Sequence, residues 1–336
     1  MPKVSVIVPN YNHARFLEQR IQSILNQTYQ DFEVIYLDDA STDNSNEVFA
    51  QFADDPRIRS ILNPSNSGSP FKQWNKGIKA AKGEYVWIAE SDDYADPRFL
   101  ETLVKVLDQN SNIGLVYCSS WAVDEQNTII CNCRDWLRHS EPTRWKKDFV
   151  AIGVDEASQN FILENTIPNA SAVLIRREVF EKIGGAIETM RLCGDWMTWT
   201  KILLSSDVAY ISEPLNYFRY HPQSVRKTSL LDGLDVEESY QTTSHILKSI
   251  PCTPTTKEQV LQLLNEQWVY AMLQPERRVS WSRNYHIFNL AQKVDSRIIY
   301  RTIRNIYVHI IAQSTFLLRL NQIMVQTKSL IYSSNS

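Results

Sequence analysis

Glycine is scarce in this chain, with nine residues among 336. Neither a G-x-G-x-x-G fingerprint nor a Walker A loop follows the first predicted strand, which excludes the glycine-rich phosphate cradles of dinucleotide-binding and P-loop proteins. Cysteine is also rare, and an odd number of five favours free thiols in a reducing compartment over a disulfide framework. Cys131 and Cys133 form a C-x-C pair, but no second pair or histidine cluster completes a zinc site.

Long apolar runs and an excess of charge are absent as well. No apolar stretch reaches the ~18 residues that a membrane-spanning helix needs. The opening MPKVSVIVPN predicts a strand that runs into Pro9 rather than a signal peptide. The formal net charge of −3 gives no reason to expect bulk binding of nucleic acid. We therefore expect a cytoplasmic protein with no nucleic-acid partner, and peripheral contact with the inner face of a membrane stays open.

Strand and helix patterns alternate over the first half of the chain. Such alternation is typical of an α/β fold with a mostly parallel, doubly wound sheet and right-handed crossovers. After residue 225 the pattern changes to helices divided by prolines, so we expect a catalytic domain over 1–225 and a helical C-terminal extension over 226–336. The predicted strands cover 4–8, 34–37, 58–62, 85–89 and 172–175, and the predicted helices of the extension cover 239–250, 257–273 and 294–320.

Polar clusters follow three of these strands at the point where each strand ends. The residues PNYN follow the first strand, Asp38 and Asp39 follow the second, and Asp92 and Asp93 follow the strand at 85–89. A single acidic pair is commonly just a helix N-cap. Three clusters at the carboxyl edge of one sheet, however, indicate a ligand site. Adjacent buried carboxylates repel unless a cation lies between them, and a divalent ion that holds a phosphorylated ligand meets this requirement.

Four segments carry a family resemblance. In order and spacing, VSVIVPNYN, LDDASTDNS, GEYVWIAESDD and CGDWMTW resemble the inverting glycosyltransferases of family 2, and the match covers roughly the first 225 residues. The resemblance implies a GT-A (nucleotide-diphospho-sugar transferase) fold. It also implies a nucleotide-diphosphate sugar as donor, a UDP-sugar above all, with Mg²⁺ or Mn²⁺ as cofactor and a sugar or lipid-linked acceptor.

The resemblance also implies roles for the residues on the donor side. Pro9 and Tyr11 are expected to line the nucleotide pocket, and Asp39 is expected to hydrogen-bond the base. Asp92 and Asp93 match the D-x-D element, in which Asp92 contacts the nucleotide sugar and Asp93 binds the metal. The family often has Asp where this chain has Glu90, so the role of that position stays open.

On the acceptor side, Asp195 matches the general base that activates the acceptor hydroxyl. Arg219 and His221 belong to a segment that resembles the closing element of the family, where such residues approach the diphosphate. Trp196 and Trp199 beside Asp195 are expected to be core residues, although one of them could stack on an acceptor sugar.

Two further segments are informative but ambiguous. The polar, irregular stretch at 124–159 is expected to be a long loop that serves as a lid, an acceptor surface or a simple surface excursion. This chain lacks the Ala-Arg-Asn segment that the family often has after the N-x-G turn. The donor contact that the arginine of that segment makes is therefore either lost or supplied by Lys72.

The last predicted helix, at 294–320, has an apolar stripe beside several arginines. We expect it to dock on the catalytic domain, with a partner protein or an anionic membrane surface as the alternatives.

Together these patterns predict a metal-dependent, inverting glycosyltransferase that acts in polysaccharide, glycolipid or protein-glycan synthesis. Two alternatives are a glycoside hydrolase that pairs Asp92 or Asp93 with Asp195, and a catalytically inactive GT-A-like scaffold. A hydrolase needs neither nucleotide nor metal. A scaffold has no reason to keep all four aspartates of the site.

Overall fold

A computed structural model describes residues 1–137, 139, 143–221, 232–274 and 276–311. Within these residues, ten strands form one sheet, in which eight follow the order β3-β2-β1-β4-β9-β6-β10-β5, while β7 pairs with β6 and β8 with β10. The strands are β1 (Val4–Asn10), β2 (Phe32–Asp38), β3 (Ile58–Leu62), β4 (Tyr85–Ile88), β5 (Tyr94–Ala95), β6 (Ile113–Val123), β7 (Ile129–Asn132), β8 (Phe149–Ala151), β9 (Val173–Arg176) and β10 (Asp207–Arg219).

Strands β3, β2, β1 and β4 are parallel neighbours, and so are β6 and β10. Strand β9 lies antiparallel between β4 and β6 and joins the two parallel groups. The predicted α/β class with a central sheet of mostly parallel strands is confirmed. Because β1, β2 and β4 run in the same direction, the polar clusters that follow them meet at one edge of the sheet.

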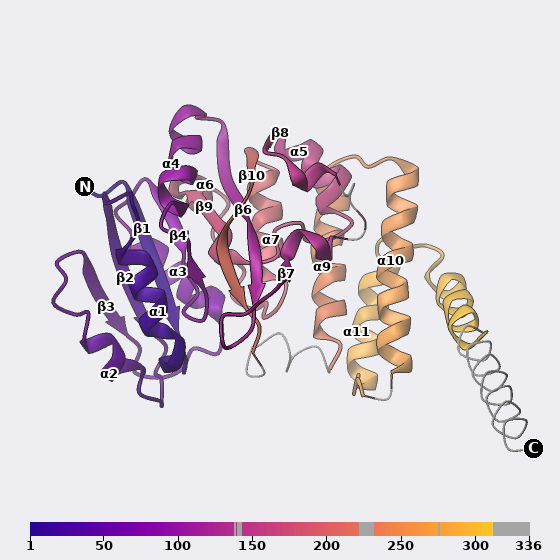
Figure 1. Cartoon of the computed structure of the whole chain (residues 1–336). Coiled ribbons are helices and arrows are strands. Elements are labelled where there is room, and N and C mark those ends of the chain that lie inside the picture. Colours follow the sequence, from indigo (N-terminus) through magenta and orange to yellow (C-terminus); the bar gives the residue numbers. More distant parts are fainter. Residues whose placement is uncertain (138, 140–142, 222–231, 275, 312–336) are drawn as a thin grey trace, which may run out of the picture.

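Helices cover both faces of the sheet (Figure 1). They are α1 (Ala14–Leu25), α2 (Ser45–Ala50), α3 (Pro70–Ala80), α4 (Phe99–Gln109), α5 (Gly153–Glu156), α6 (Arg177–Lys182) and α7 (Gly194–Leu203). On one face, α1 and α4 place Leu17, Ile21 and Leu103 against Val6 and Val8. On the other face, α3 and α7 pack against the side chains of β1, β2 and β4 that point the opposite way, such as Ile7. This is the alternation expected of strands buried on both faces.

The extension contains the helices α9 (Leu234–Ser249), α10 (Pro254–Leu273) and α11 (Trp281–Gln292), and residues 298–311 form a further helix. Helix α9 packs beside α7, and α10 and α11 pack against α9. The extension has its own core, which includes Tyr240, Trp268 and Ile287. None of the helices in the described ranges is long and apolar enough to cross a membrane. The expected domain boundary at 225 falls in residues 222–231, outside the described residues, so it stays a prediction.

The structure differs from the sequence-based expectation in two places. The stretch at 124–159 contains β7, β8 and α5, and it pairs with β6 and β10, so it is an added edge of the sheet and not one long loop. Helix α11 was not predicted, because only Ile287 and Ala291 of its residues are buried and its apolar pattern is weak. Of the helix expected at 294–320, only the part up to residue 311 lies within the described residues.

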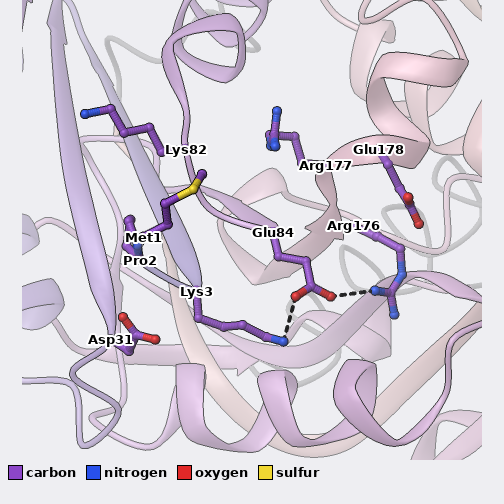
Figure 2. Close-up of a pocket in the computed structure, with 9 residues that line it drawn as sticks. All are labelled: Met1, Pro2, Lys3, Asp31, Lys82, Glu84, Arg176, Arg177 and Glu178. Carbon is purple, nitrogen blue, oxygen red and sulfur yellow. Dashed lines mark hydrogen bonds and ion pairs between the residues drawn. The ribbon is translucent and has the colours of Figure 1, made fainter.

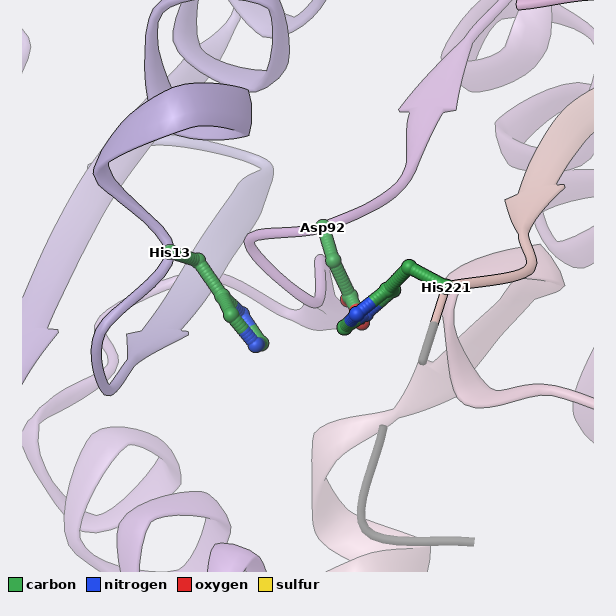
Figure 3. A group of neighbouring side chains, drawn as sticks. All are labelled: His13, Asp92 and His221. Carbon is green, nitrogen blue, oxygen red and sulfur yellow. The ribbon is translucent and has the colours of Figure 1, made fainter. Parts of the chain in front are cut away.

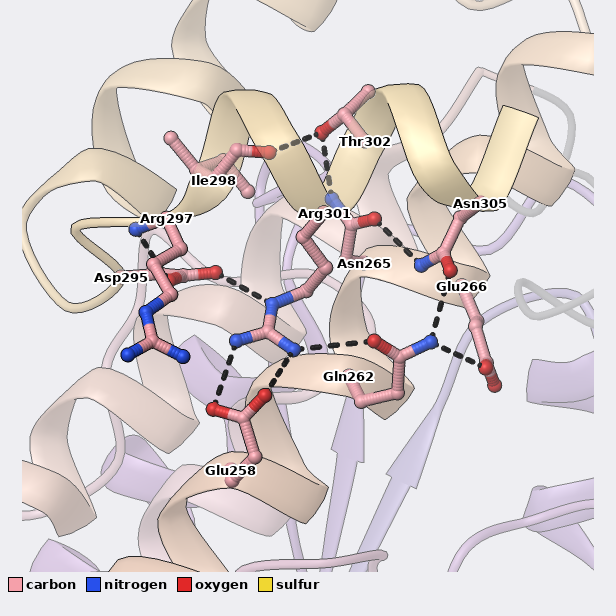
Figure 4. Close-up of polar contacts among 10 residues, drawn as sticks. All are labelled: Glu258, Gln262, Asn265, Glu266, Asp295, Arg297, Ile298, Arg301, Thr302 and Asn305. Atoms are coloured by element: carbon pink, nitrogen blue, oxygen red, sulfur yellow. Dashed lines mark hydrogen bonds and ion pairs between the residues drawn. The ribbon is translucent and has the colours of Figure 1, made fainter. Parts of the chain in front are cut away.

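The helix at 298–311 docks through polar contacts (Figure 4). Buried Arg301 donates to Asp295 Oδ2 at 2.8 Å and forms a two-point ion pair with Glu258 of α10, at 2.8 and 3.0 Å. Asn305 donates to Asn265 Oδ1 of the same helix at 2.7 Å. These contacts place the helix on α10 of the extension, whereas docking on the catalytic domain was expected; the polar side of the helix faces the protein, and most of its apolar side chains are exposed.

Candidate active site

The end of β1 is fixed by the buried amide of Asn10. Its Nδ2 donates to the hydroxyl of Tyr36, to Asp38 Oδ1 and to Ser41 Oγ, each at 3.1 Å. These bonds join the ends of β1 and β2. Tyr11 follows and is 45% exposed, so its ring is available at the surface of the cavity described below.

Asp39 is buried at the end of β2 and organises the loop between β3 and α3. Its carboxylate accepts hydrogen bonds from Asn63 Nδ2 at 2.6 Å, from Gln73 Nε2 at 2.8 Å, and from the amide and hydroxyl of Ser67 at 3.0 and 2.8 Å. These contacts shape one wall of a first cavity of about 310 Å³, lined by Pro9, Asn10, Tyr11, His13, Asp39, Asn66, Gly68, Ser69, Pro70, Gln73, Glu90, Ser91 and Arg191.

The acidic turn after β4 has carboxyl groups in three different environments. Glu90 accepts a hydrogen bond from Trp74 Nε1 at 2.8 Å, and burial raises the pKa of Glu90 to about 8. Burial and the charge of Asp92 raise the pKa of Asp93. Burial alone would raise the pKa of Asp92, but the neighbouring imidazoles of His13 and His221 hold that pKa below its usual value. Asp92 is therefore the carboxylate of this turn that most readily carries a negative charge.

Asp92 lies between two histidines (Figure 3). His221 Nε2 lies 3.0 Å from Asp92 Oδ2, and one potential ligand atom from each of His13, Asp92 and His221 lies within 4.8 Å of the others. His221 Nδ1 is buried and has no hydrogen-bond partner within the described part of the chain. Two imidazole nitrogens and a carboxylate oxygen, gathered from three distant segments, form a donor set that suits a divalent transition metal.

Asp93 is the expected metal ligand, and that role stays a prediction. Its Oδ1 accepts the backbone N–H of Arg219 at 2.9 Å, and it does not belong to the group around His13 and His221. Beneath it lies Arg20 of α1, fully buried over the ring of Trp87 and attracted mainly by Asp93. Arg20 supplies positive charge under the turn, a role that the sequence pattern around it does not indicate.

Arg219 ties three segments together. Its guanidinium donates to the carbonyl of Asp92, to Asn127 Oδ1 and to Gln19 Oε1, each at 2.8 Å. Because each of its three nitrogens donates to a protein atom, Arg219 holds α1, the acidic turn and the turn after β6 in place in this structure. Its expected contact with the diphosphate stays a prediction.

Asp195 lies in the first turn of α7. Its Oδ1 accepts the backbone N–H of Trp196 at 2.6 Å, and its Oδ2 accepts Asn165 Nδ2 at 3.4 Å. It lines a second cavity of about 230 Å³ together with His13, Pro70, Phe71, Trp74, Glu90, Asp92, Asp93, Pro168, Asn169, Ala170, Arg191, Leu192 and Phe218. The two cavities share His13, Pro70, Glu90 and Arg191. The structure thus brings Asp195 to the same cavity as Asp92 and Asp93, about a hundred residues earlier in the chain.

Both tryptophans beside Asp195 are core residues, as expected. Trp199 is fully buried and stacks on Trp74 with ring centroids 5.8 Å apart, and the indole N–H of Trp196 donates to the carbonyl of Phe161 at 3.1 Å. They position α7 and leave the cavity to other side chains.

Arg191 is a candidate site residue that was not predicted from the sequence. It is exposed, it lines both cavities, and its side chain has no hydrogen-bond or ion-pair partner among the residues that the structure describes. Lys72 donates to the carbonyl of Ser67 at 3.2 Å; whether it supplies the donor contact of the family's missing arginine, or that contact is lost, stays open.

A third cavity, of about 450 Å³, lies at the opposite edge of the sheet (Figure 2). There Glu84 forms ion pairs with Lys3 at 2.7 Å and Arg176 at 3.0 Å. Its charges are thus largely balanced within the protein, and it contains none of the expected site residues.

A mostly parallel sheet with aspartates grouped at its carboxyl edge fits the GT-A fold of nucleotide-sugar transferases. The model of glycosyl transferase family 2 matches residues 5–184, and the chain belongs to that family. It is 39% identical over 241 residues to the glycosyltransferase GlyG of Streptococcus pneumoniae, an alignment that covers 67% of this chain and 73% of the relative. The chain is therefore a glycosyltransferase.

Solved structures of two other proteins share the fold. Residues 1–349 of TarS from S. aureus match with a TM-score of 0.66 and 18% identity, over 90% of this chain and 89% of that one. The mannosyltransferase PcManGT from Pyrobaculum calidifontis, solved in complex with GDP-Man and Mn²⁺, matches with a TM-score of 0.56 and 18% identity, over 94% and 87% of the two chains.

Proposed function

We propose that this glycosyltransferase moves a sugar from a nucleotide-diphosphate donor, a UDP-sugar above all, to an acceptor hydroxyl with inversion at the anomeric carbon. The observation that carries the proposal is the pair of adjoining cavities: one is lined by Tyr11 and Asp39, the other by Asp195, and Arg191 lines both. TarS has been solved with UDP and with UDP-GlcNAc, and PcManGT with GDP-Man, which supports a donor of this class.

The proposed metal site is the group His13, Asp92 and His221. The residues fit a divalent ion, because one potential ligand atom from each of the three side chains lies within 4.8 Å of the others. The donor set favours Mn²⁺ over Mg²⁺, since Mg²⁺ prefers oxygen ligands and retains water. This assigns the metal to Asp92 in place of Asp93. A bound ion would neutralise charge that grows on the leaving diphosphate.

The protein's own groups divide the chemistry. Asp195 takes the proton of the acceptor hydroxyl while the acceptor oxygen forms a bond to the anomeric carbon. The bond from that carbon to the diphosphate breaks, and the diphosphate leaves with the electron pair. The transition state resembles the oxocarbenium ion of glycoside hydrolysis. Arg191 faces the charge that develops on the leaving group.

One experiment tests both donor and metal. Release of nucleoside diphosphate is measured over a panel of UDP- and GDP-sugars, with Mn²⁺, with Mg²⁺ and with EDTA. We expect release from a UDP-sugar that requires a divalent ion and is faster with Mn²⁺. Equal release in EDTA would refute the metal role. Family membership decides against the glycoside hydrolase, and the absence of release from any donor would favour the inactive scaffold.

The extension adds a proposed membrane contact. Most apolar side chains of the helix at 298–311 cover one arc of its surface, and exposed Arg297 and Arg304 lie along one edge of that arc. An apolar face bordered by arginines is typical of a helix that lies in an anionic membrane surface. The exposed side chains of the arc are Ile299 (59%), Tyr300 (69%), Ile303 (64%), Tyr307 (66%), Ile310 (56%) and Ile311 (41%).

Sedimentation with vesicles tests this contact. We expect the protein to sediment with vesicles of anionic lipid and to be released by salt, because the arginine contribution is electrostatic. Ile303→Glu places a charge within the arc and should abolish binding. Concentration-dependent self-association without vesicle binding would instead identify the arc as an interface between copies of this chain.

A further inference from the structure

The segment that leads into α7 is held from two sides. On the sheet side, Asn75 of α3 donates to the carbonyl of Ala186 at 3.0 Å and accepts the N–H of the same residue at 2.9 Å. Ser69 donates to the carbonyl of Glu188 at 3.0 Å. These bonds attach the segment to the helix that forms the wall of the first cavity.

On the other side, the segment is held by one carboxylate of the extension. Glu238 of α9 is 3% exposed, and its Oε1 accepts the backbone N–H of Arg191 at 2.7 Å. Its Oε2 accepts the N–H groups of Leu192 and Cys193, at 2.8 and 2.7 Å. Three short bonds to a carboxylate are charge-assisted, which makes them stronger than bonds between neutral groups.

This carboxylate meets the three N–H groups immediately before α7, where the helix dipole also favours negative charge. Both functional side chains of the segment lie within two residues of these N–H groups. Arg191 lines both cavities, and Asp195 lies in the first turn of α7 and lines the second. Gly194 lies between them against Phe71, so closely that a Cβ at this position would overlap the ring.

We propose that Glu238 is a positioning residue of the transferase site: through the backbone of 191–193 it fixes Arg191 and Asp195 toward the reacting groups. The proposal rests on the proposed function for its kinetic consequence. It makes the extension part of the active site, since the residue that sets the acceptor side comes from α9. A misplacement of about 1 Å at a reacting group costs on the order of a hundredfold in rate.

The test compares Glu238→Gln with Glu237→Gln. The control removes a neighbouring carboxylate of the same helix, which pairs with Arg283 inside the extension and does not contact the segment. In Glu238→Gln the side-chain NH₂ group replaces one acceptor and opposes a backbone N–H. We expect kcat for donor turnover with Mn²⁺ to fall about 10- to 100-fold, with the donor KM changed less than about threefold. The control should keep the wild-type kcat.

Amide hydrogen exchange provides a readout that needs no turnover. The hydrogen bonds to Glu238 protect the N–H groups of Leu192 and Cys193 from exchange, so these two groups should exchange about tenfold faster or more in Glu238→Gln. The exchange of the backbone N–H groups of residues 38–42, which serve as an internal reference, should be unchanged. Faster exchange with a wild-type kcat would overturn the positioning role, and so would unchanged exchange. If the wild type releases no nucleotide from any donor, the proposed function fails. The exchange result still reports whether Glu238 holds the backbone of residues 191–193.

A second variant covers the case in which Glu238→Gln does not fold. Glu238→Asp keeps the charge and shortens the side chain by one methylene, so an intermediate loss of kcat is expected. The proposal would be overturned if Glu238→Asp folds, has the same kcat as the control Glu237→Gln, and shows wild-type hydrogen exchange at Leu192 and Cys193.

Discussion

Asp195→Asn separates the chemical role of this residue from its structural role. The wild-type carboxylate accepts the N–H of Trp196 at 2.6 Å, and asparagine keeps an oxygen at that place. The 3.4 Å contact with Asn165 Nδ2 is weakened, because an amide nitrogen then competes for the same position. A contact of that length contributes about 1 kcal/mol or less. The melting temperature should therefore change by less than about 3 °C.

The loss in catalysis should be much larger. Asparagine cannot take the acceptor proton, and the removal of a general base typically costs 10²–10⁴-fold in rate. That range corresponds to about 3–5 kcal/mol in the barrier. Asp39 and the Asp92 group are untouched, so the affinity for UDP with Mn²⁺ should stay within about twofold of the wild type.

Three measurements on the same preparation complete the test: sugar transfer, calorimetric titration of UDP with Mn²⁺, and thermal unfolding. Glu178→Gln serves as control, since Glu178 is likewise an acidic residue in the first turn of a helix, α6, but lines the cavity at the opposite edge of the sheet. Near-normal transfer by Asp195→Asn would show that the base lies elsewhere. Loss of UDP binding would place Asp195 on the donor side and refute the division of roles.

Four further changes test other parts of the site and the extension. His13→Ala should raise the Mn²⁺ concentration needed for UDP binding about 10- to 100-fold, and an unchanged titration would remove His13 from the metal site. Arg191→Ala should lower kcat about 10- to 100-fold without a change in melting temperature, since its side chain is exposed. Gly194→Ala should destabilise the fold by about 1–3 kcal/mol in thermal unfolding, because the new methyl group overlaps Phe71. Arg301→Ala should lower the free energy of unfolding of the extension by about 3–5 kcal/mol, because it leaves buried Asp295 without its cation. The helix at 298–311 should then be cleaved rapidly by protease, and a helix that resists cleavage would contradict this prediction.

The sheet and the placement of the site could be predicted because their signals are local. Strands buried on both faces produce continuous apolar runs, and the polar residues that end them are adjacent in sequence. The expectation that Trp196 and Trp199 are core residues held for the same reason, since helical spacing reports one face of a helix.

The remaining features depend on contacts between distant segments. Asp92 and His221 are 129 residues apart, and nothing near Asp92 in the sequence indicates which histidine joins it. The same holds for Glu238, which is 45 residues from Cys193, the nearest of its three donors in sequence. Arg219 has a structural role that its sequence neighbourhood did not indicate: its guanidinium holds three segments together. Its contact with the diphosphate, expected from the family resemblance, stays a prediction.

The antiparallel strand β9 has a consequence for the order in which the protein folds during synthesis. Strand β4 bonds to β9 through pairs such as Val86 with Ile175, so one edge of this fully buried strand stays unpaired until the ribosome has made some ninety further residues. An unpaired apolar edge is prone to aggregation. The acidic turn also cannot form all its contacts before this point in synthesis, because the N–H of Glu90 donates to Oγ of Ser171, just before β9, at 3.2 Å. The acidic turn therefore takes its final shape late in synthesis, and a nascent chain that ends before β9 should depend on chaperones to stay unaggregated.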